Sequence, residues 1–187
     1  FSAYLGRHDM SLIASTLFLA LQATPSIAPT APPPPPCMAP EFGQFDFWVG
    51  EWDVFPNGKD SQVAHSKIEK LYAGCAIREN WMPLKGPGGG SLNGYNPATK
   101  RWHQTWIGAA PGHVEFDGGF VGGKMVLTGM WAGVNGPGQD ALIRMSYTLQ
   151  PDGSVRQHGE QSTDHGLTWS TNFDFIYKKR KEPIPAK

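Results

Sequence analysis

Side chains suited to acid–base chemistry fall on three segments whose residues alternate in the manner of β-strands. They comprise two carboxyl groups, Glu79 and Glu160, two imidazoles, His103 and His158, and the guanidinium of Arg156. A carboxylate can act as a general base, an imidazole as a general acid and a guanidinium as a clamp for a carboxylate or oxyanion. If the fold brings these catalytic candidates together, they predict a cofactor-free lyase, isomerase or hydrolase that acts on an aromatic or sugar-like substrate.

Aromatic and amide side chains on the same segments indicate a binding cavity. Strand alternation places Glu79 on the face of Trp81, and it places Gln104 on the face of Trp106. Indole rings beside carboxyl and amide groups are typical of a partly polar, aromatic-lined site for a small molecule. We therefore expect the ligand-binding residues Trp81, Gln104, Trp106 and Trp131. In the alternative interpretation, the tryptophans pack a filled core and the polar side chains face solvent.

The elements that must position these side chains are short strands. From Trp52 onward, runs of β-prone residues alternate with turn signals of Gly, Pro, Asn or Asp. A short helix is expected only at 42–49. Sequential strands with short loops favour an all-β, up-and-down antiparallel barrel of about eight to ten strands, which has no free edges and encloses room for one small ligand. The alternative is a two-sheet sandwich without a cavity. Strands are expected near 52–55, 61–72, 75–82, 91–95, 101–107, 113–116, 120–121, 124–131, 141–150, 155–162 and 169–179, with two of the short ones merging.

The N-terminal region reads as an export signal followed by a spacer. Met10 precedes an apolar run at 12–21, which is too short to cross a bilayer but suits the core of a secretory signal. Ala23 and Ala28 offer cleavage sites, and eight prolines between 25 and 40 predict an extended polyproline spacer. We therefore expect a secreted or periplasmic protein. The expected organisation is a signal peptide with upstream residues at 1–28, a Pro-rich tether at 29–41, a β-barrel domain at 42–180 and a tail at 181–187.

The two cysteines, Cys37 and Cys75, form an even pair. In an oxidising compartment such a pair predicts one disulfide. The bond would close a loop of about 39 residues and contribute on the order of 4 kcal/mol through the entropy of the unfolded chain. The alternative is that Cys75 is a small buried core residue and Cys37 is a free thiol.

Composition and missing motifs exclude several other functions. The chain has 16 basic and 16 acidic residues, a balance that argues against a nucleic-acid partner. No pair of its six histidines has helical metal spacing, and Gly122-Gly123-Lys124 lacks the rest of a phosphate loop. We expect no metal, no cofactor and no membrane span. The expected partner is a small-molecule ligand or substrate, and the oligomeric state stays open.

One stretch of sequence resembles a known group of barrels. Residues 45–54 resemble the start of calycin-like barrels, the lipocalin and fatty-acid-binding group, in which a short helical turn leads through Gly-x-Trp into the first strand. Here the triplet is Gly50-Glu51-Trp52. With the patterns at 74–81, 95–106 and Thr168-Trp169, the chain is similar over about 42–180 to an exported bacterial family of calycin-like domains of uncharacterised function. The resemblance implies the fold and no particular activity. It also implies that Trp52 plugs the closed end of the barrel beneath a basic residue, Lys178, Lys179 or Arg180.

A second motif lies at 162–169, where Ser-Thr-Asp-His-Gly-Leu-Thr-Trp fits the Asp-box pattern S-x-D-x-G-x-T-W known from sialidases. The motif stabilises a β-hairpin because its aspartate accepts hydrogen bonds from turn amides. It occurs once here, whereas a propeller would repeat it in each blade. We therefore expect a structural hairpin rather than a sialidase site.

Overall fold

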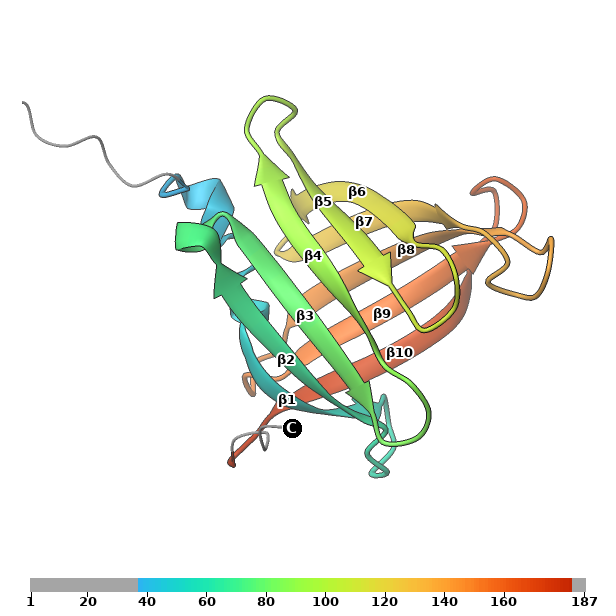
Figure 1. Cartoon of the computed structure of the whole chain (residues 1–187), viewed down its shortest axis with the longest axis horizontal. Coiled ribbons are helices and arrows are strands. Elements are labelled where there is room, and N and C mark those ends of the chain that lie inside the picture. Colours follow the sequence, from blue (N-terminus) through green and yellow to red (C-terminus); the bar gives the residue numbers. More distant parts are fainter. Residues whose placement is uncertain (1–36, 183–187) are drawn as a thin grey trace, which may run out of the picture. The chain divides into compact units, whose positions relative to one another are not determined.

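Ten antiparallel strands close into an up-and-down barrel in the computed structural model, which describes residues 37–182 (Figure 1). Each strand pairs with its neighbours in sequence, and β1 closes the barrel against β10, with Trp52 opposite Lys179. The strands are β1 Gly50–Pro56, β2 Ala64–Leu71, β3 Ala76–Pro83, β4 Gly89–Asn96, β5 Arg101–Ile107, β6 Val114–Val121, β7 Lys124–Trp131, β8 Ala141–Leu149, β9 Val155–Ser162 and β10 Ser170–Lys179.

This architecture confirms the barrel expected from the sequence and excludes the two-sheet sandwich. The strands expected at 101–107, 124–131 and 155–162 have the observed bounds of β5, β7 and β9. The two short strands expected at 113–116 and 120–121 merge into β6. The sequence pattern predicted these strand bounds correctly because turn residues separate nearly every pair of strands, so that each boundary has a local signal.

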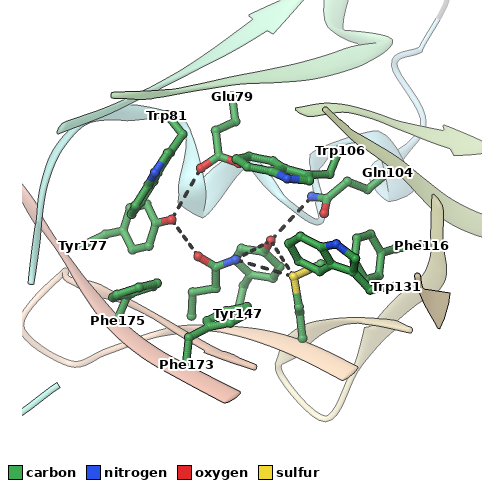
Figure 2. A pocket seen from close by; sticks show the side chains of 12 residues that line it. Glu79, Trp81, Gln104, Trp106, Phe116, Trp131, Tyr147, Phe173, Phe175 and Tyr177 are labelled. Atoms are coloured by element: carbon green, nitrogen blue, oxygen red, sulfur yellow. Dashed lines mark hydrogen bonds between the residues drawn. The ribbon is translucent and has the colours of Figure 1, made fainter. Parts of the chain in front are cut away.

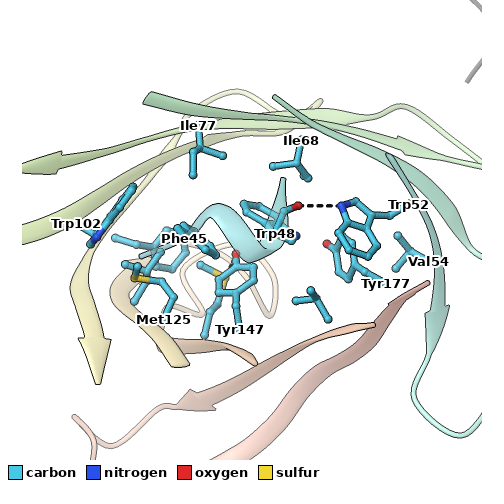
Figure 3. Close-up of a cluster of buried hydrophobic side chains, with 14 of the residues drawn as sticks. Phe45, Trp48, Trp52, Val54, Ile68, Ile77, Trp102, Met125, Tyr147 and Tyr177 are labelled. Carbon is cyan, nitrogen blue, oxygen red and sulfur yellow. Dashed lines mark hydrogen bonds between the residues drawn. The ribbon is translucent and has the colours of Figure 1, made fainter. Parts of the chain in front are cut away.

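One end of the barrel is filled by a plug formed by the segment that precedes β1. The short helix expected at 42–49 is found as two 3₁₀ turns, η1 Pro40–Gly43 and η2 Asp46–Trp48. Phe45 and Trp48 are fully buried, and their rings stack with centroids 4.8 Å apart. Figure 3 shows them among the first inward side chains of β3, β5 and β7, which are Ile77, Trp102 and Met125. The plug therefore occupies the end at which these three strands begin.

Trp52 supports the plug, although not beneath a basic residue. Its indole Nε1 donates a 2.8 Å hydrogen bond to the carbonyl oxygen of Trp48. The stack implied by the calycin resemblance is not among the cation–π contacts of residues 37–182, where Lys178 lies over Phe55 and Arg144 over Trp169. Lys178 belongs to the outer face of β10, because its neighbour Tyr177 points inward and is buried, and the Arg180 guanidinium pairs with Asp53 at 2.7 Å.

A disulfide between Cys37 and Cys75 confirms the cysteine pairing, with a Cα–Cα distance of 5.0 Å. Cys75 follows the short turn η3 Tyr72–Gly74 and directly precedes β3. The bond therefore attaches the chain just before the plug to the closed end of the barrel. Cys37 lies within the segment expected to be a spacer at 29–41, so the last part of that segment is tied to the barrel. No helix among the described residues has the length and apolar character needed to cross a membrane.

The Asp-box segment forms the hairpin between β9 and β10. Asp164 Oδ1 accepts hydrogen bonds from Ser162 Oγ at 2.6 Å and from the Thr168 backbone N–H at 2.9 Å. Trp169 Nε1 donates to the carbonyl oxygen of Gly166 at 3.0 Å, and the Arg144 guanidinium covers the indole from the outer face. Every one of these partners lies within the hairpin or on the outside of the barrel, which agrees with a structural role.

Two adjacent glycines of β6 give a matched test of how closely the backbones of β6 and β7 approach each other. A Cβ atom at Gly118 would collide with the carbonyl oxygen of Val126, whereas a Cβ atom at Gly119 would meet nothing within 4 Å. We expect Gly118→Ala to lower the free energy of unfolding by about 2 kcal/mol through overpacking. Gly119→Ala should leave it unchanged or slightly raised. Chemical denaturation of both variants tests this, and equal effects would contradict the close approach.

Candidate functional site

The other half of the barrel interior holds a cavity of about 190 Å³ (Figure 2). Three tryptophans line it from near the carboxyl ends of β3, β5 and β7. Alternate strands of an antiparallel meander run in the same direction, so that these rings gather at the end opposite the plug. Phe173 and Phe175 line it from β10, with their rings stacked at 5.6 Å. The aromatic lining consists of Trp81, Trp106, Phe116, Trp131, Tyr147, Phe173, Phe175 and Tyr177.

A carboxyl group lies among these aromatic side chains. Glu79 on β3 is only 5% exposed and lines the cavity. Ser66 Oγ donates to its Oε1 at 3.1 Å, and Ser91 Oγ donates to its Oε2 at 3.2 Å. These serines lie on β2 and β4, the two strands paired with β3, and Ser91 sits directly opposite Glu79 in the ladder. The Tyr177 hydroxyl from β10 lies 3.4 Å from Oε1.

The hydrogen-bond network continues across the cavity through two amides. The Tyr177 hydroxyl donates to Gln157 Oε1 at 2.7 Å, and Gln157 Nε2 donates to the Tyr147 hydroxyl oxygen at 2.9 Å. Gln104 Nε2 donates to Asn93 Oδ1 at 2.6 Å and reaches the Tyr147 oxygen at 3.5 Å. The only acceptor near the Tyr147 proton among the described residues is the Met145 thioether sulfur at 3.7 Å. Since sulfur is a weak acceptor, the Tyr147 hydroxyl can donate to a ligand.

Burial dominates the electrostatics of this network. It raises the pKa of Glu79 to about 7, against the lowering effect of the hydrogen bonds from Ser66, Ser91 and Tyr177. Burial also raises the pKa of Tyr147 and of Tyr177 above the usual value, so that both phenols stay protonated. No lysine, arginine or histidine of residues 37–182 lines the cavity. The site therefore holds one carboxyl group that titrates near neutral pH among neutral polar and aromatic side chains.

The structure brings together all four expected ligand-binding residues and one of the five catalytic candidates. Trp81, Gln104, Trp106 and Trp131 line the cavity together with Glu79. Their side chains occupy inward positions, as strand alternation predicts. In the part of the chain that the structure describes, no group of His, Cys, Asp and Glu side chains is arranged to hold a metal ion.

The other four catalytic candidates do not meet Glu79, because they occupy outward positions of β5 and β9. The inward neighbours are instead Gln104 on β5 and Gln157 on β9, both of which line the cavity. Each outward side chain has its own partner on the outer face. The contacts are His103 to Asp117 at 3.0 Å, Arg156 to Asp174 at 2.7 Å, His158 to Thr171 at 3.1 Å and Glu160 to Arg144 at 2.9 Å.

Sequence reasoning missed the polar residues that complete the network. Tyr147 ends the inward series of β8, which runs Ala141, Ile143, Met145, Tyr147 and is buried throughout. This alternation was a usable signal for its direction. Ser66, Ser91 and Asn93 gave no such signal, because serine and asparagine are mostly found on solvent-facing positions.

Comparisons with known proteins do not assign the chain to a family. A scan against models of known protein families finds no match, and a search of curated proteins finds no similar sequence. The function must therefore be inferred from the cavity itself.

Proposed function

We propose that this protein is an exported binding protein that holds a compact aromatic small molecule in its barrel cavity. The observation that carries the proposal is the unfilled volume of about 190 Å³ that aromatic side chains and a hydrogen-bonded polar network line. An apolar cavity of about 150 Å³ is large enough to bind benzene, so this one suits a ligand of one or two rings. A barrel whose interior is completely filled by its own side chains would not leave such a volume.

Polar groups in the cavity would orient the ligand. The Tyr147 proton has only a weak sulfur acceptor, and Gln104 Oε1 accepts no hydrogen bond from the described residues. These groups offer one donor and one acceptor to a bound molecule. A few placed polar groups among apolar walls are typical of small-molecule sites, where the walls supply affinity and the polar groups supply specificity.

Aromatic-wall variants test the proposal. With one- and two-ring aromatic compounds, we expect Trp106→Ala to weaken binding roughly tenfold, because a stacking surface of the cavity is lost. Trp169→Ala is the matched control, since Trp169 packs under Arg144 outside the cavity, and it should not change the affinity. Isothermal titration calorimetry measures both. No binding by any compound of the panel, or equal losses in the two variants, would contradict the proposal.

A cofactor-free enzyme is the second candidate function, and the observation that favours it is the buried carboxyl of Glu79 beside the cavity. A carboxyl group that titrates near pH 7 is matched to proton transfer at physiological pH. Of the catalytic candidates, Glu79 would be the general base, and the Tyr147 and Tyr177 hydroxyls, which line the cavity, would be the proton donors. Product analysis after incubation with bound compounds tests this, because turnover by wild type that Glu79→Gln abolishes would favour the enzyme over the binding protein.

The proposal includes membership of the calycin-like group and export to the periplasm or beyond. The closed antiparallel barrel with a plug before its first strand, and the Cys37–Cys75 disulfide, support it. The proposed organisation keeps a signal peptide at 1–28, a tether at 29–41, the barrel at 42–180 and a tail at 181–187. Expression in a bacterial host followed by mass measurement tests it: a periplasmic product that begins after Ala23 or Ala28 is expected, and an uncleaved cytoplasmic product would contradict it.

A further inference from the structure

We propose that the ligand is a compact aromatic amine in its ammonium form, with its cationic nitrogen at the Glu79 carboxylate and its ring between the tryptophans. The inference rests on the proposed function, because it names the chemical class that the cavity selects. Three features of the site carry it: an anion without a counter-charge, walls that attract cations, and an unused acceptor in the same cavity.

The first feature is the missing counter-charge. Among the described residues, Glu79 is the only ionisable side chain besides the tyrosines that lines the cavity. The arginine and lysine side chains that form ion pairs in the described part of the chain do so with other carboxylates. A buried carboxylate with no positive partner is unfavourable. A cation that enters the cavity would supply the partner which the protein itself lacks.

The hydrogen bonds around Glu79 nevertheless favour its ionised form. Asn93 Nδ2 donates to Ser91 Oγ at 3.0 Å, which directs the Ser91 proton toward Glu79 Oε2. Ser66 donates to the other oxygen, so that each carboxylate oxygen accepts a hydroxyl proton. A neutral carboxylic acid keeps only its carbonyl oxygen as a good acceptor, so hydroxyl donors at both oxygens favour the carboxylate. These hydrogen bonds therefore stabilise a carboxylate whose negative charge a bound cation would neutralise.

The aromatic walls provide the second feature. In the view of Figure 2 the carboxylate lies between the rings of Trp81 and Trp106 and points toward Tyr177. The ring centroids of Trp81 and Tyr177 are 6.3 Å apart, so both rings border the space next to the carboxylate. Electron-rich ring faces attract organic cations, most strongly where water is excluded. An anionic ligand would meet both these faces and the Glu79 charge unfavourably.

An unused acceptor, Gln104 Oε1, provides the third feature. An ammonium group has three N–H donors, and Glu79 can satisfy one or two of them. Gln104 Oε1 lines the same cavity and accepts no hydrogen bond from the described residues. A ligand group without an N–H or O–H donor would leave this oxygen unpaired. The cavity thus presents more acceptors than donors, which matches a cation.

The proposal predicts a proton linkage. The titratable groups that face Glu79 are Tyr177 from β10 and Tyr147 from β8, and both stay neutral; its neighbours on β2 and β4, Ser66 and Ser91, do not titrate. Since the pKa of Glu79 is raised to about 7, binding of an ammonium ion must displace a proton below that pH. Affinity for the cation should therefore rise roughly 30-fold from pH 5.5 to pH 8.

Calorimetric titration with two matched probes tests the inference. Tryptamine and tryptophol share the indole ring and ethyl chain, and they differ in an ammonium against a hydroxyl group. We expect tryptamine to bind wild type at least tenfold more tightly than tryptophol at pH 8, and Glu79→Gln to abolish this preference while tryptophol still binds. Glu160→Gln removes the same charge from the outer face and should keep the preference.

The outcomes separate this inference from the proposed function. Equal or tighter binding of tryptophol by wild type would overturn the cation inference and leave the binding function standing. No binding of either probe, nor of the wider aromatic panel, would overturn both. Should Glu79→Gln fail to fold, wild type alone decides: heats measured at pH 6 in buffers of different ionisation enthalpy should show proton release with tryptamine and none with tryptophol, and equal values would contradict the inference.

Discussion

Replacing both Cys37 and Cys75 by serine is expected to lower the free energy of unfolding by about 4 kcal/mol. The bond joins residues 38 positions apart in sequence, and its loss restores the conformational freedom of that loop in the unfolded chain. In the folded state the bond holds the chain just before η1 against the turn that precedes β3. Its loss therefore also loosens the plug, which contains the buried residues Phe45 and Trp48.

Urea denaturation of the double-serine variant and of wild type, with and without reductant, measures this effect. Reductant should destabilise wild type by a similar amount and should have no effect on the variant, which serves as its own control. A loss smaller than about 1 kcal/mol would mean that neither the unfolded chain nor the plug depends on the bond.

Wild type is expected to lose roughly 3 kcal/mol of stability relative to Glu79→Gln between pH 4 and pH 8. The usual pKa of a glutamate is 4.5, and burial raises that of Glu79 in the folded protein to about 7. The folded state therefore binds a proton that the unfolded state has already released, and the stabilisation is complete below pH 4.5. It is lost as pH rises through about 7, because the folded protein must then hold a buried carboxylate.

The free energy of unfolding of Glu79→Gln and of a control variant is compared with that of wild type at both pH values, which separates this effect from all other titrating groups. Gln104→Met is the matched control, because it alters the same cavity and leaves Glu79 and both phenols in place. Its difference from wild type should be the same at pH 4 and pH 8. A pH-independent difference for Glu79→Gln would show that Glu79 titrates in the folded protein as it does in water.

The fold was largely predictable because its signals are local. Turn residues mark the strand ends. Strict alternation places Trp81, Trp106 and Trp131 on inward positions near the ends of β3, β5 and β7, which run in the same direction. The exact form of the plug was less accessible, since three or four residues around Pro40 and Asp46 form 3₁₀ turns that carry no periodicity of their own.

The candidate site was predictable only in part because β9 is polar on both faces. Alternation separates Arg156, His158 and Glu160 from Gln157, and it does not say which set points inward. Tertiary contacts decide it: Val155 is fully buried, and Gly159 leaves space that the Phe173 ring occupies. Catalytic residue types therefore drew attention to the wrong face of β9, whereas the inward amide of Gln157 joins the network.

Whether a ligand occupies the cavity can be read directly from the indole N–H resonances of the seven tryptophans during a titration. With saturating tryptamine, we expect large chemical-shift changes at Trp81, Trp106 and Trp131, which line the cavity. Trp169, which packs under Arg144 on the outer face, should not shift. Shifts confined to Trp169, or no shifts at the three cavity tryptophans with any aromatic compound, would contradict a ligand site in the cavity.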